Sequence, residues 1–493
     1  MKSNTILLFM FFAVFFTSCQ DELNIEPKQR EDASVTLSTE EGVTNVLTGT
    51  YALAARGNAY GGRILVYADL LGATGATATT EFRFRGSFGE LRQMYIKQML
   101  ADNVIITGTY SRCYEIVNAT NTVIDNISKV KDPAKQARMI GEANFLRSLA
   151  YFDLVRFFAK PYVSGQANNQ LGIVIRDKAI YDFNADLSKE RSTVAEVYKV
   201  IIDGLNLAYT NLPKDNSFYA DKYAAKALLA RVYLQQGNYA LARDAADDVI
   251  KNSGHSLSTK YADAFNHDTD QAEDVFAIQI TKQTGVNDAN TFYSAENNGG
   301  RGGDIAIRDP YLEKFTDPND DRAKFNYVNP VNDRILTLKF TDQFANVGII
   351  RLAEMYLTRA EANYHLGGDA LADINIIRAR VKLDPKTGLS GPTLLRQIYK
   401  ERRLELAFEG LRLYDIRREK DPNTGRPVIE SLMGPSGTFV QYNLSSVDPY
   451  ETTNLREPQD KGINFNAAKN LLWPIPQLEI DLSGGIITQN PGY

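Results

Sequence analysis

Apolar and polar residues alternate with a helical period in the stretch from Asp221 to Asn252. Five apolar positions recur three or four residues apart and define one face of a helix: Ala225, Leu228, Leu229, Val232 and Tyr233. Gly237 interrupts the pattern, and a second apolar face follows it over 239–250. Two amphipathic helices joined by a short turn predict an antiparallel helical hairpin.

The same arrangement returns over 351–383. Its apolar positions are Leu352, Met355, Tyr356 and Ala360 before the turn, and Leu371, Ile374 and Ile377 after it. The pair Gly367-Gly368 supplies the turn. The Tyr, Gly and Ala spacing of the first hairpin is similar to a tetratricopeptide repeat without its early Trp. About 130 residues separate the starts of the two hairpins, so insertions must interrupt the array.

A third helical region begins at Pro133, a residue type favoured in the first turn, and ends before Pro161. The stretch 108–127 is its expected partner. Long segments with little periodicity lie at about 56–93, 281–345 and 420–469, and segments of this length inside compact domains are usually functional or disordered. The pattern predicts a mainly α fold, with tetratricopeptide-like helical hairpins supporting a loop-rich, irregular half.

The N-terminus has the layout of a secretory signal. Lys2 precedes an uninterrupted apolar run from Ile6 to Phe16, and the small residues Thr17 and Ser18 follow. Eleven apolar residues are fewer than the roughly 20 that a membrane-spanning helix needs. We therefore expect a signal peptide over 1–18 and one mature domain over 19–493, in which Cys113 is a buried apolar residue on a helix.

Charge and composition argue against several functions. The net charge of −5 and pI near 5.6 are unlike those of nucleic-acid-binding proteins. The three histidines lack the spacing of a zinc helix. Asp317, Asp320 and Asp321 gather oxygen ligands that could hold Ca²⁺, but the EF-hand spacing is missing and a polar turn at Pro318 is the favoured interpretation. No metal or other cofactor is expected.

The motif "ERRLELAFEG" places Glu401, Glu405 and Glu409 at i, i+4 and i+8. A carboxylate pair would suit a glycosidase, but carboxylates stacked along one helical face do not flank a substrate. Ion pairing with the neighbouring Arg402 and Arg403 is the favoured interpretation. No catalytic constellation is expected, and the chain is predicted not to be an enzyme.

Aromatic residues in the long loops are the best candidates for ligand contact, because rings stack on flat ligands while polar neighbours form hydrogen bonds. The first candidate set comprises Tyr60, Tyr67, Asp69, Phe82, Arg83, Phe84, Arg85 and Phe88. The second comprises Phe292, Tyr293, Asn297, Asn298 and Arg301. The alternation of Phe and Arg over 82–85 fits equally well a strand whose Phe residues face the core.

Several motifs together resemble the SusD/RagB family. They are "GEANFLRSLAYFDLVRFFAKPY", "RLAEMYLTRAEANYHLGGDALADINIIRAR", "IYKERRLELAFEGLRLYDIRRE" and the terminal "NLLWPIPQLEIDLSGGIITQNPGY". In addition, "FTSC" resembles the lipobox of bacterial lipoproteins, which implies lipidation of Cys19, and "QDE" after it resembles the surface-export signal of Bacteroidetes lipoproteins. Multiple acyl chains would hold such a protein durably at a membrane.

The resemblance implies a lipid-anchored, surface-facing protein of the outer membrane that binds nutrients without catalysis. Because the terminal motif belongs to the whole family, the resemblance implies that Trp473, the single tryptophan, packs the C-terminal segment. It also implies a partner, a SusC-like TonB-dependent transporter on which the protein sits as a lid. The family's ligands are usually oligosaccharides, so glycan capture is the leading hypothesis. Peptide binding is the first alternative, and a structural lipoprotein that holds protein partners on its helical repeats is the second.

Overall fold

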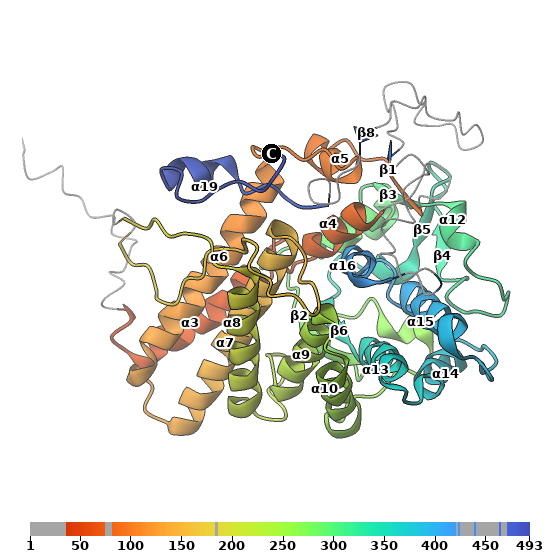
Figure 1. Ribbon diagram of the computed structural model, residues 1–493, viewed down its shortest axis with the longest axis horizontal. Helices are drawn as coiled ribbons and strands as arrows, with labels where there is room; N and C mark the ends of the chain where they lie inside the picture. The colour runs from red at the N-terminus through yellow and green to blue at the C-terminus, as the bar shows by residue number, and fades with distance from the viewer. Residues whose placement is uncertain are drawn as a thin grey trace, which may run out of the picture.

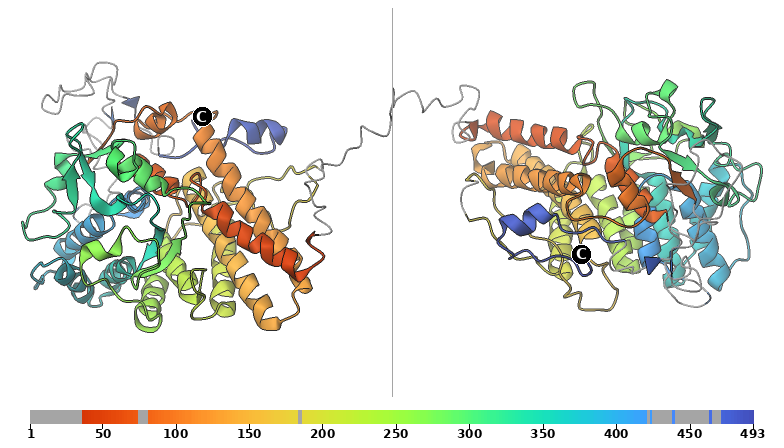
Figure 2. Two further views of the ribbon diagram at one scale, coloured as in Figure 1. Left: turned by 180° about the vertical axis from the view of Figure 1, so that it is seen from behind. Right: turned by 90° about the horizontal axis from the view of Figure 1, so that it is seen from above.

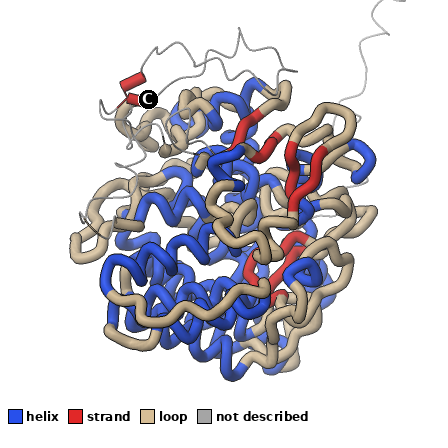
Figure 3. The backbone as a smooth tube through the Cα atoms, turned by 90° about the vertical axis from the view of Figure 1, so that its right-hand side faces the viewer, coloured by secondary structure: helices blue, strands red, loops and turns tan. Residues whose placement is uncertain are grey.

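The structure is a computed structural model that describes residues 36–73, 81–182, 186–420, 423, 438–439, 463–464 and 471–493. One half is a curved layer of long helices, and the other half combines short strands, short helices and loops (Figure 1). Figure 3 shows the two kinds of structure side by side. The mainly α fold with a loop-rich half, predicted above, is confirmed.

The helical layer is an array in which each long helix packs against the next (Figures 1 and 2). Its helices are α3 (Glu40–Ala54), α6 (Val104–Asp125), α7 (Pro133–Phe158), α8 (Val194–Asn211), α9 (Lys222–Gln236), α10 (Tyr239–Asn252), α13 (Leu352–Leu366), α14 (Ala370–Arg380) and α15 (Gly391–Glu405). Within the described residues, we find no helix with both the length and the apolar character needed to cross a bilayer.

Residues visible in the sequence set the helix boundaries. Gly237 and Gly367 end α9 and α13 in the left-handed conformation, with φ of 71° and 73°, where a side chain would be strained. Asp132 caps α7 in front of Pro133. These observations confirm the two predicted hairpins, α9 with α10 and α13 with α14, and the pairing of α7 with α6.

The two hairpins are adjacent in space although a long insert separates them in sequence. Helix α10 packs directly on α13, while residues 253–351 leave the helical layer and return to it. This insert supplies much of the irregular half. The interruption expected from the sequence therefore exists along the chain and not in the helical array itself.

The irregular half contains more regular structure than the sequence predicted. A four-stranded antiparallel sheet has the order β1-β3-β5-β4, and β2 pairs with β6. The strands are β1 (Phe82–Phe84), β2 (Asp274–Ile278), β3 (Ile305–Ile307), β4 (Asn326–Val328), β5 (Ile335–Thr337), β6 (Val347–Arg351), β7 (Thr438–Phe439) and β8 (Ile463–Asn464). The short helices are α4 (Arg63–Gly72), α5 (Gly89–Tyr95), η2 (Ile127–Lys129), η3 (Tyr261–Ala264), α11 (Asp288–Tyr293), η4 (Glu296–Asn298), α12 (Asp309–Leu312), η5 (Leu338–Phe340), α16 (Arg412–Arg418) and α19 (Gln477–Leu482).

Two of the predicted loops contain regular structure. The segment 56–93 contains the helix α4, which is buried along most of its length. The apolar residues of this helix therefore pack in the core and do not contact a ligand. The predicted loop over 281–345 is crossed by β3, β4, β5 and short helices. Most of the third predicted loop, 420–469, lies outside the described residues, as do Cys19 and the predicted signal peptide.

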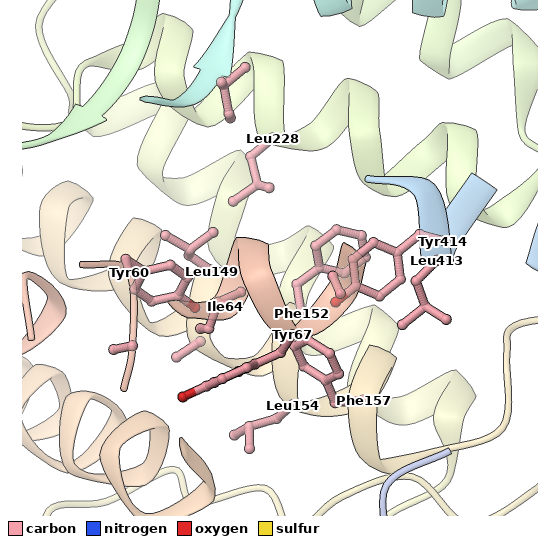
Figure 4. Close-up of a cluster of buried hydrophobic side chains, with 14 of the residues drawn as sticks. Tyr60, Ile64, Tyr67, Leu149, Phe152, Leu154, Phe157, Leu228, Leu413 and Tyr414 are labelled. Atoms are coloured by element: carbon pink, nitrogen blue, oxygen red, sulfur yellow. The ribbon is translucent and has the colours of Figure 1, made fainter. Parts of the chain in front are cut away.

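The core joins the two halves around aromatic rings from distant segments (Figure 4). Tyr60 and Tyr67, from the turn before α4 and from α4 itself, lie among side chains of α7 such as Phe152. Trp473 is fully buried and stacks on Phe157 with ring centroids 4.2 Å apart and planes inclined by 14°. The packing role predicted for the tryptophan is confirmed.

Polar contacts fix the C-terminal segment over this core. The Asn490 side chain donates hydrogen bonds of 2.8 Å to the carbonyl oxygens of Phe158 and Trp473 and accepts one of 2.9 Å from Arg191. Cys113 on α6 is also buried, as expected, and burial raises the pKa of its thiol.

Candidate functional site

Most of the predicted ligand-binding side chains are part of the core. The buried members are Tyr60, Tyr67, Asp69, Phe82, Arg83, Phe84, Phe292 and Tyr293. Within the two candidate sets, the side chains with more solvent contact are Arg85, Phe88, Asn297, Asn298 and Arg301. The structure therefore reduces the two candidate sets to a smaller group that a ligand can reach.

The alternation over 82–85 forms a strand whose Phe residues face the core, which was the alternative left open by the sequence. Strand β1 pairs with β3, and the ring of Phe82 packs 4.9 Å from that of Phe408. Arg83 lies between Phe82 and Phe84 in sequence and is also buried, with 8% of its surface exposed. Both faces of this strand are therefore covered.

Asp69 and Tyr293, one from each candidate set, meet inside the protein. The Tyr293 hydroxyl donates a 2.8 Å hydrogen bond to Asp69, and the backbone N–H of Gly410 donates one of 3.3 Å to the same carboxylate oxygen. Burial raises the pKa of Asp69 to about 6, and the nearby Arg403 and these hydrogen bonds limit the increase. The pair joins two distant segments and is structural.

We predict that Asp69→Asn stabilises the protein at pH 7. In the native protein Asp69 keeps its proton up to about pH 6, whereas in the unfolded chain it loses the proton near pH 3.8. Stability therefore falls as pH rises between these values, by up to about 3 kcal/mol. Asn does not ionise and still accepts the hydrogen bond from Tyr293. The free energy of unfolding should be measured by urea denaturation at pH 4, 5, 6 and 7. The stability of the variant relative to the wild type should increase as pH rises, and a difference independent of pH would contradict the prediction.

Phe88 and Arg301, one from each candidate set, meet at one place beside Ser87. We give the name Phe88 surface to Ser87, Phe88 and Arg301, together with Asn297 and Asn298 on the loop that leads to Arg301. Phe88 is 38% exposed, and its ring meets the buried ring of Phe292 edge-on at 6.1 Å. The Arg301 guanidinium carbon lies 4.7 Å from the centre of the Phe88 ring. An exposed ring beside a guanidinium can combine stacking with hydrogen bonding, and the loop that carries the guanidinium also carries two amides.

Asp304 fixes the Phe88 surface through two hydrogen bonds. Its carboxylate accepts a hydrogen bond of 3.1 Å from Arg301 Nε, and its backbone oxygen accepts one of 2.6 Å from the N–H of Arg85. Burial raises the pKa of Asp304, and Arg301 opposes this shift. Gly86 approaches so closely that a Cβ there would lie 2.7 Å from the Asp304 side chain. Any larger residue at position 86 would therefore displace the Asp304 side chain.

The hairpin of β4 and β5 holds the loop that bears Asn297, Asn298 and Arg301. The Tyr327 hydroxyl oxygen accepts hydrogen bonds from the N–H of Ala295 at 2.9 Å and from Asn298 at 3.3 Å. Arg334 donates hydrogen bonds of 3.1 Å to the carbonyl oxygens of Gly302 and Gly303. Both glycines have positive φ. The sequence analysis missed Tyr327 and Arg334, because only the folded hairpin brings them to this loop.

The possible Ca²⁺ ligands are occupied by other partners. Asp320 binds Arg322 through two hydrogen bonds of 2.9 Å, Asp321 pairs with Lys382 at 3.0 Å, and Asp317 accepts the N–H of Asn319 within its own turn. In the described part of the chain, no three His, Cys, Asp or Glu side chains lie together as metal ligands would.

The carboxylates of "ERRLELAFEG" form a buried charge network. Glu401 pairs with Arg378 at 2.6 Å and with Arg322 at 2.8 Å. Glu405 contacts Arg351, Arg380 and Arg322, and Glu409 lies 2.6 Å from Lys339 and 2.7 Å from Arg351. The predicted ion pairing is present, but its partners are remote residues. Arg402 and Arg403 pair elsewhere, with Asp415 and Glu81.

The electrostatics of this network oppose a catalytic role. Burial by itself raises the pKa of Glu405, but the surrounding Arg380, Arg351 and Arg322 outweigh it and lower the pKa to about 2. A general acid needs a raised pKa and access to substrate. The pKa of Glu405 is lowered instead, and its fully buried side chain is out of reach of a substrate.

Two family models match the chain. Residues 275–493 match a model described as the SusD family, and residues 23–234 match one described as starch-binding associating with outer membrane. Among curated proteins, the SusD-like protein P2 of Formosa agariphila is 24% identical over 470 residues, covering 83% of this chain and 85% of that protein. The SusD-like protein P25 of the same organism is 23% identical and covers 85% and 90%.

Solved structures have the same fold. A SusD superfamily protein from Bacteroides thetaiotaomicron superposes with a TM-score of 0.73 at 26% identity, covering 92% of this chain and all of that chain. A second one, from Bacteroides vulgatus, gives 0.73 at 24% identity, covering 92% and 99%. The matches span both the helical layer and the irregular half. This chain thus belongs to the SusD/RagB family of glycan-binding proteins associated with the outer membrane.

Proposed function

We propose that this protein captures oligosaccharides at the cell surface and delivers them to a SusC-like TonB-dependent transporter. A lipid on Cys19 would keep it at the outer membrane, facing outward. The observation that supports capture most directly is the Phe88 surface. There, two segments more than 200 residues apart place an exposed ring next to a guanidinium, and the loop that carries the guanidinium also carries two asparagines.

The chemistry of this surface suits a sugar. The apolar face of a pyranose can stack on the Phe88 ring, while Arg301 and the two asparagines offer hydrogen bonds to hydroxyl groups. The loop that presents these groups is already fixed by Tyr327 and Arg334. Little conformational entropy is therefore lost when a ligand binds there.

We predict that Phe88→Ala weakens oligosaccharide binding by about tenfold or more, equivalent to about 1.4 kcal/mol. The variant removes the only large exposed ring of the Phe88 surface, whereas Arg301→Ala removes its exposed cation. Calorimetric titration with a panel of oligosaccharides that begins with maltoheptaose would measure both losses.

Phe218→Ala is the matched control, because Phe218 is also an exposed ring, 47% exposed, and lies outside the Phe88 surface. If Phe88→Ala and the wild type bound oligosaccharides with equal affinity, the Phe88 surface would not be the oligosaccharide-binding site. The bound oligosaccharide should be recovered unchanged after incubation, because capture involves no turnover.

Peptide capture is the second candidate, and the exposed Arg301 supports it because a guanidinium also binds peptide carboxylates. Binding of peptides in the absence of binding by any oligosaccharide would favour it. A structural role for the helical layer would instead predict co-purification with a membrane protein other than a TonB-dependent transporter. Co-purification with such a transporter from outer membranes tests the delivery step.

A further inference from the structure

A large cavity is lined by residues of α3, α6 and α19 and of the segments 174–181 and 186–188. Figure 1 shows where these helices lie in the fold. Its volume is about 1080 Å³, at the upper end of the range for small-molecule sites. It shares no lining residue with the Phe88 surface. The proposed capture of oligosaccharides leaves this cavity without a role.

Aliphatic side chains form a large part of the cavity walls. The aliphatic side chains are Leu37, Val46, Leu53, Val117, Val174, Ile180, Leu187, Leu482 and Ile487. Three tyrosines also contribute. The rings of Tyr110 and Tyr114 pack on each other with centroids 4.7 Å apart, and the hydroxyl of the half-exposed Tyr181 accepts a hydrogen bond from Asn126. Such a surface offers contact to methylene groups more than a flat platform for a sugar ring.

Several of the polar side chains in the walls form hydrogen bonds within the protein. Asn118 accepts a hydrogen bond of 2.7 Å from the N–H of Ile180 and donates one to its carbonyl oxygen. The Tyr114 hydroxyl donates to the carbonyl oxygen of Val174 at 2.7 Å, and Arg176 donates to that of Leu187. Ser483 is likewise bonded to the backbone of its own turn. These bonds reduce the capacity of the walls to bind sugar hydroxyls and favour an apolar ligand.

Exposed apolar residues continue from the cavity over the neighbouring surface. Leu482, which lines the cavity, is 74% exposed, and Leu478 on the same helix is 52% exposed. The N–H of Gln477 donates a 2.9 Å hydrogen bond to the carbonyl oxygen of Ala101, which brings the start of α6 and the exposed Val104 alongside. Isolated exposed apolar residues are ordinary, but a group around an aliphatic cavity indicates a binding site.

The described chain begins at this cavity. Thr36 and Leu37 both line it, and Cys19 lies 17 residues before Thr36. Fully extended, that length of chain reaches at most about 60 Å. A membrane to which Cys19 is anchored would therefore lie within reach of the cavity, and so would the lipids of that membrane.

From these observations we infer that the cavity binds one long acyl chain. The methylene groups lie against the aliphatic walls, and the polar head remains in solvent at the opening, beside Leu482. A free fatty acid and a lysophospholipid share this chemistry. The inference does not depend on oligosaccharide capture at the Phe88 surface.

The test uses the soluble chain from Gln20 to Tyr493, with 11-(dansylamino)undecanoic acid as the fluorescent probe. We expect saturable binding that myristate displaces. Displacement by saturated fatty acids of 8 to 14 carbons should weaken about fourfold for each methylene removed, which corresponds to about 0.8 kcal/mol per buried CH₂. An oligosaccharide site would not show this dependence on chain length.

Two variants connect the binding to this cavity. Ala119→Phe fills it from α6 and should weaken probe binding at least tenfold, whereas Ala240→Phe adds the same ring at an exposed position of α10 and should have no effect. Leu482→Asn changes an exposed residue, so the fold tolerates it, and it should weaken binding several-fold. Leu207→Asn, at an exposed leucine of α8, is its control.

The remaining outcomes separate the possible occupants. Displacement by myristate identifies a fatty acid, and displacement by lysophosphatidylethanolamine identifies a phospholipid source. Displacement of the probe by maltoheptaose would overturn the inference, as would saturable binding that Ala119→Phe leaves unchanged. The inference would also be wrong if removal of residues 20–35 increased probe affinity more than tenfold, because that segment would then be the occupant.

Discussion

Replacing Arg322 with Met is expected to destabilise the protein by about 3–5 kcal/mol, because it removes one partner from a buried group of charges. The Arg322 side chain is 1% exposed and contacts Asp320 at 2.9 Å and Glu401 at 2.8 Å. Without the guanidinium, both carboxylates stay in the interior with fewer donors. Denaturation in guanidinium chloride, followed by circular dichroism at pH 7, would measure the loss.

Lys199→Met is the control for Arg322→Met. Lys199 pairs with Asp203 on the surface of α8, and the two side chains are 74% and 61% exposed. Solvent screens such a pair, so its loss should change stability by less than about 1 kcal/mol. Similar effects of the two substitutions would show that the buried network does not stabilise the fold as argued.

The second large effect is expected for Trp473→Ala, which should also cost about 3–5 kcal/mol. The indole is fully buried against Phe157, Phe158 and Tyr67, so truncation leaves a cavity between the C-terminal segment and α7. Circular dichroism is the suitable measurement of denaturation, because the variant has no tryptophan whose fluorescence could report unfolding.

Trp473→Phe keeps an aromatic ring on Phe157 and should recover a large part of the lost stability. Oligosaccharide affinity in this conservative variant should equal that of the wild type, because Trp473 is not part of the Phe88 surface. A Trp473→Phe variant that is as stable as the wild type but no longer binds oligosaccharides would show that the tryptophan affects the ligand site after all.

The helical layer could be predicted because its signals are local. Gly237, Gly367 and Pro133 mark helix ends through backbone geometry that each residue type imposes by itself. The direct contact of α10 with α13 could not be predicted in this way. It depends on the path of residues 253–351, whose short strands and turns have little periodicity.

The candidate site was only partly predictable for a related reason. Phe84 and Phe88 both lie in a run of alternating Phe and small or charged residues, yet Phe84 is 2% exposed and Phe88 is 38% exposed. The difference arises because β1 is covered on both faces, whereas Phe88 lies in the turn after it. Spacing identified the candidates, but only the pairing of β1 with β3 decides which of them a ligand can reach.

The direct packing of α10 on α13 has a consequence for how the ligand range of this architecture can change. Residues 253–351 start and finish on two helices that touch each other, so the scaffold does not need this segment to bridge a distance. Buried residues of the segment, such as Arg322 and Tyr293, are tied to the rest of the fold, but its exposed loops can vary in sequence and length at little cost to the helices. It contributes Asn297, Asn298 and Arg301 to the Phe88 surface. Changes confined to the exposed loops of this segment would therefore give new selectivity while keeping the scaffold.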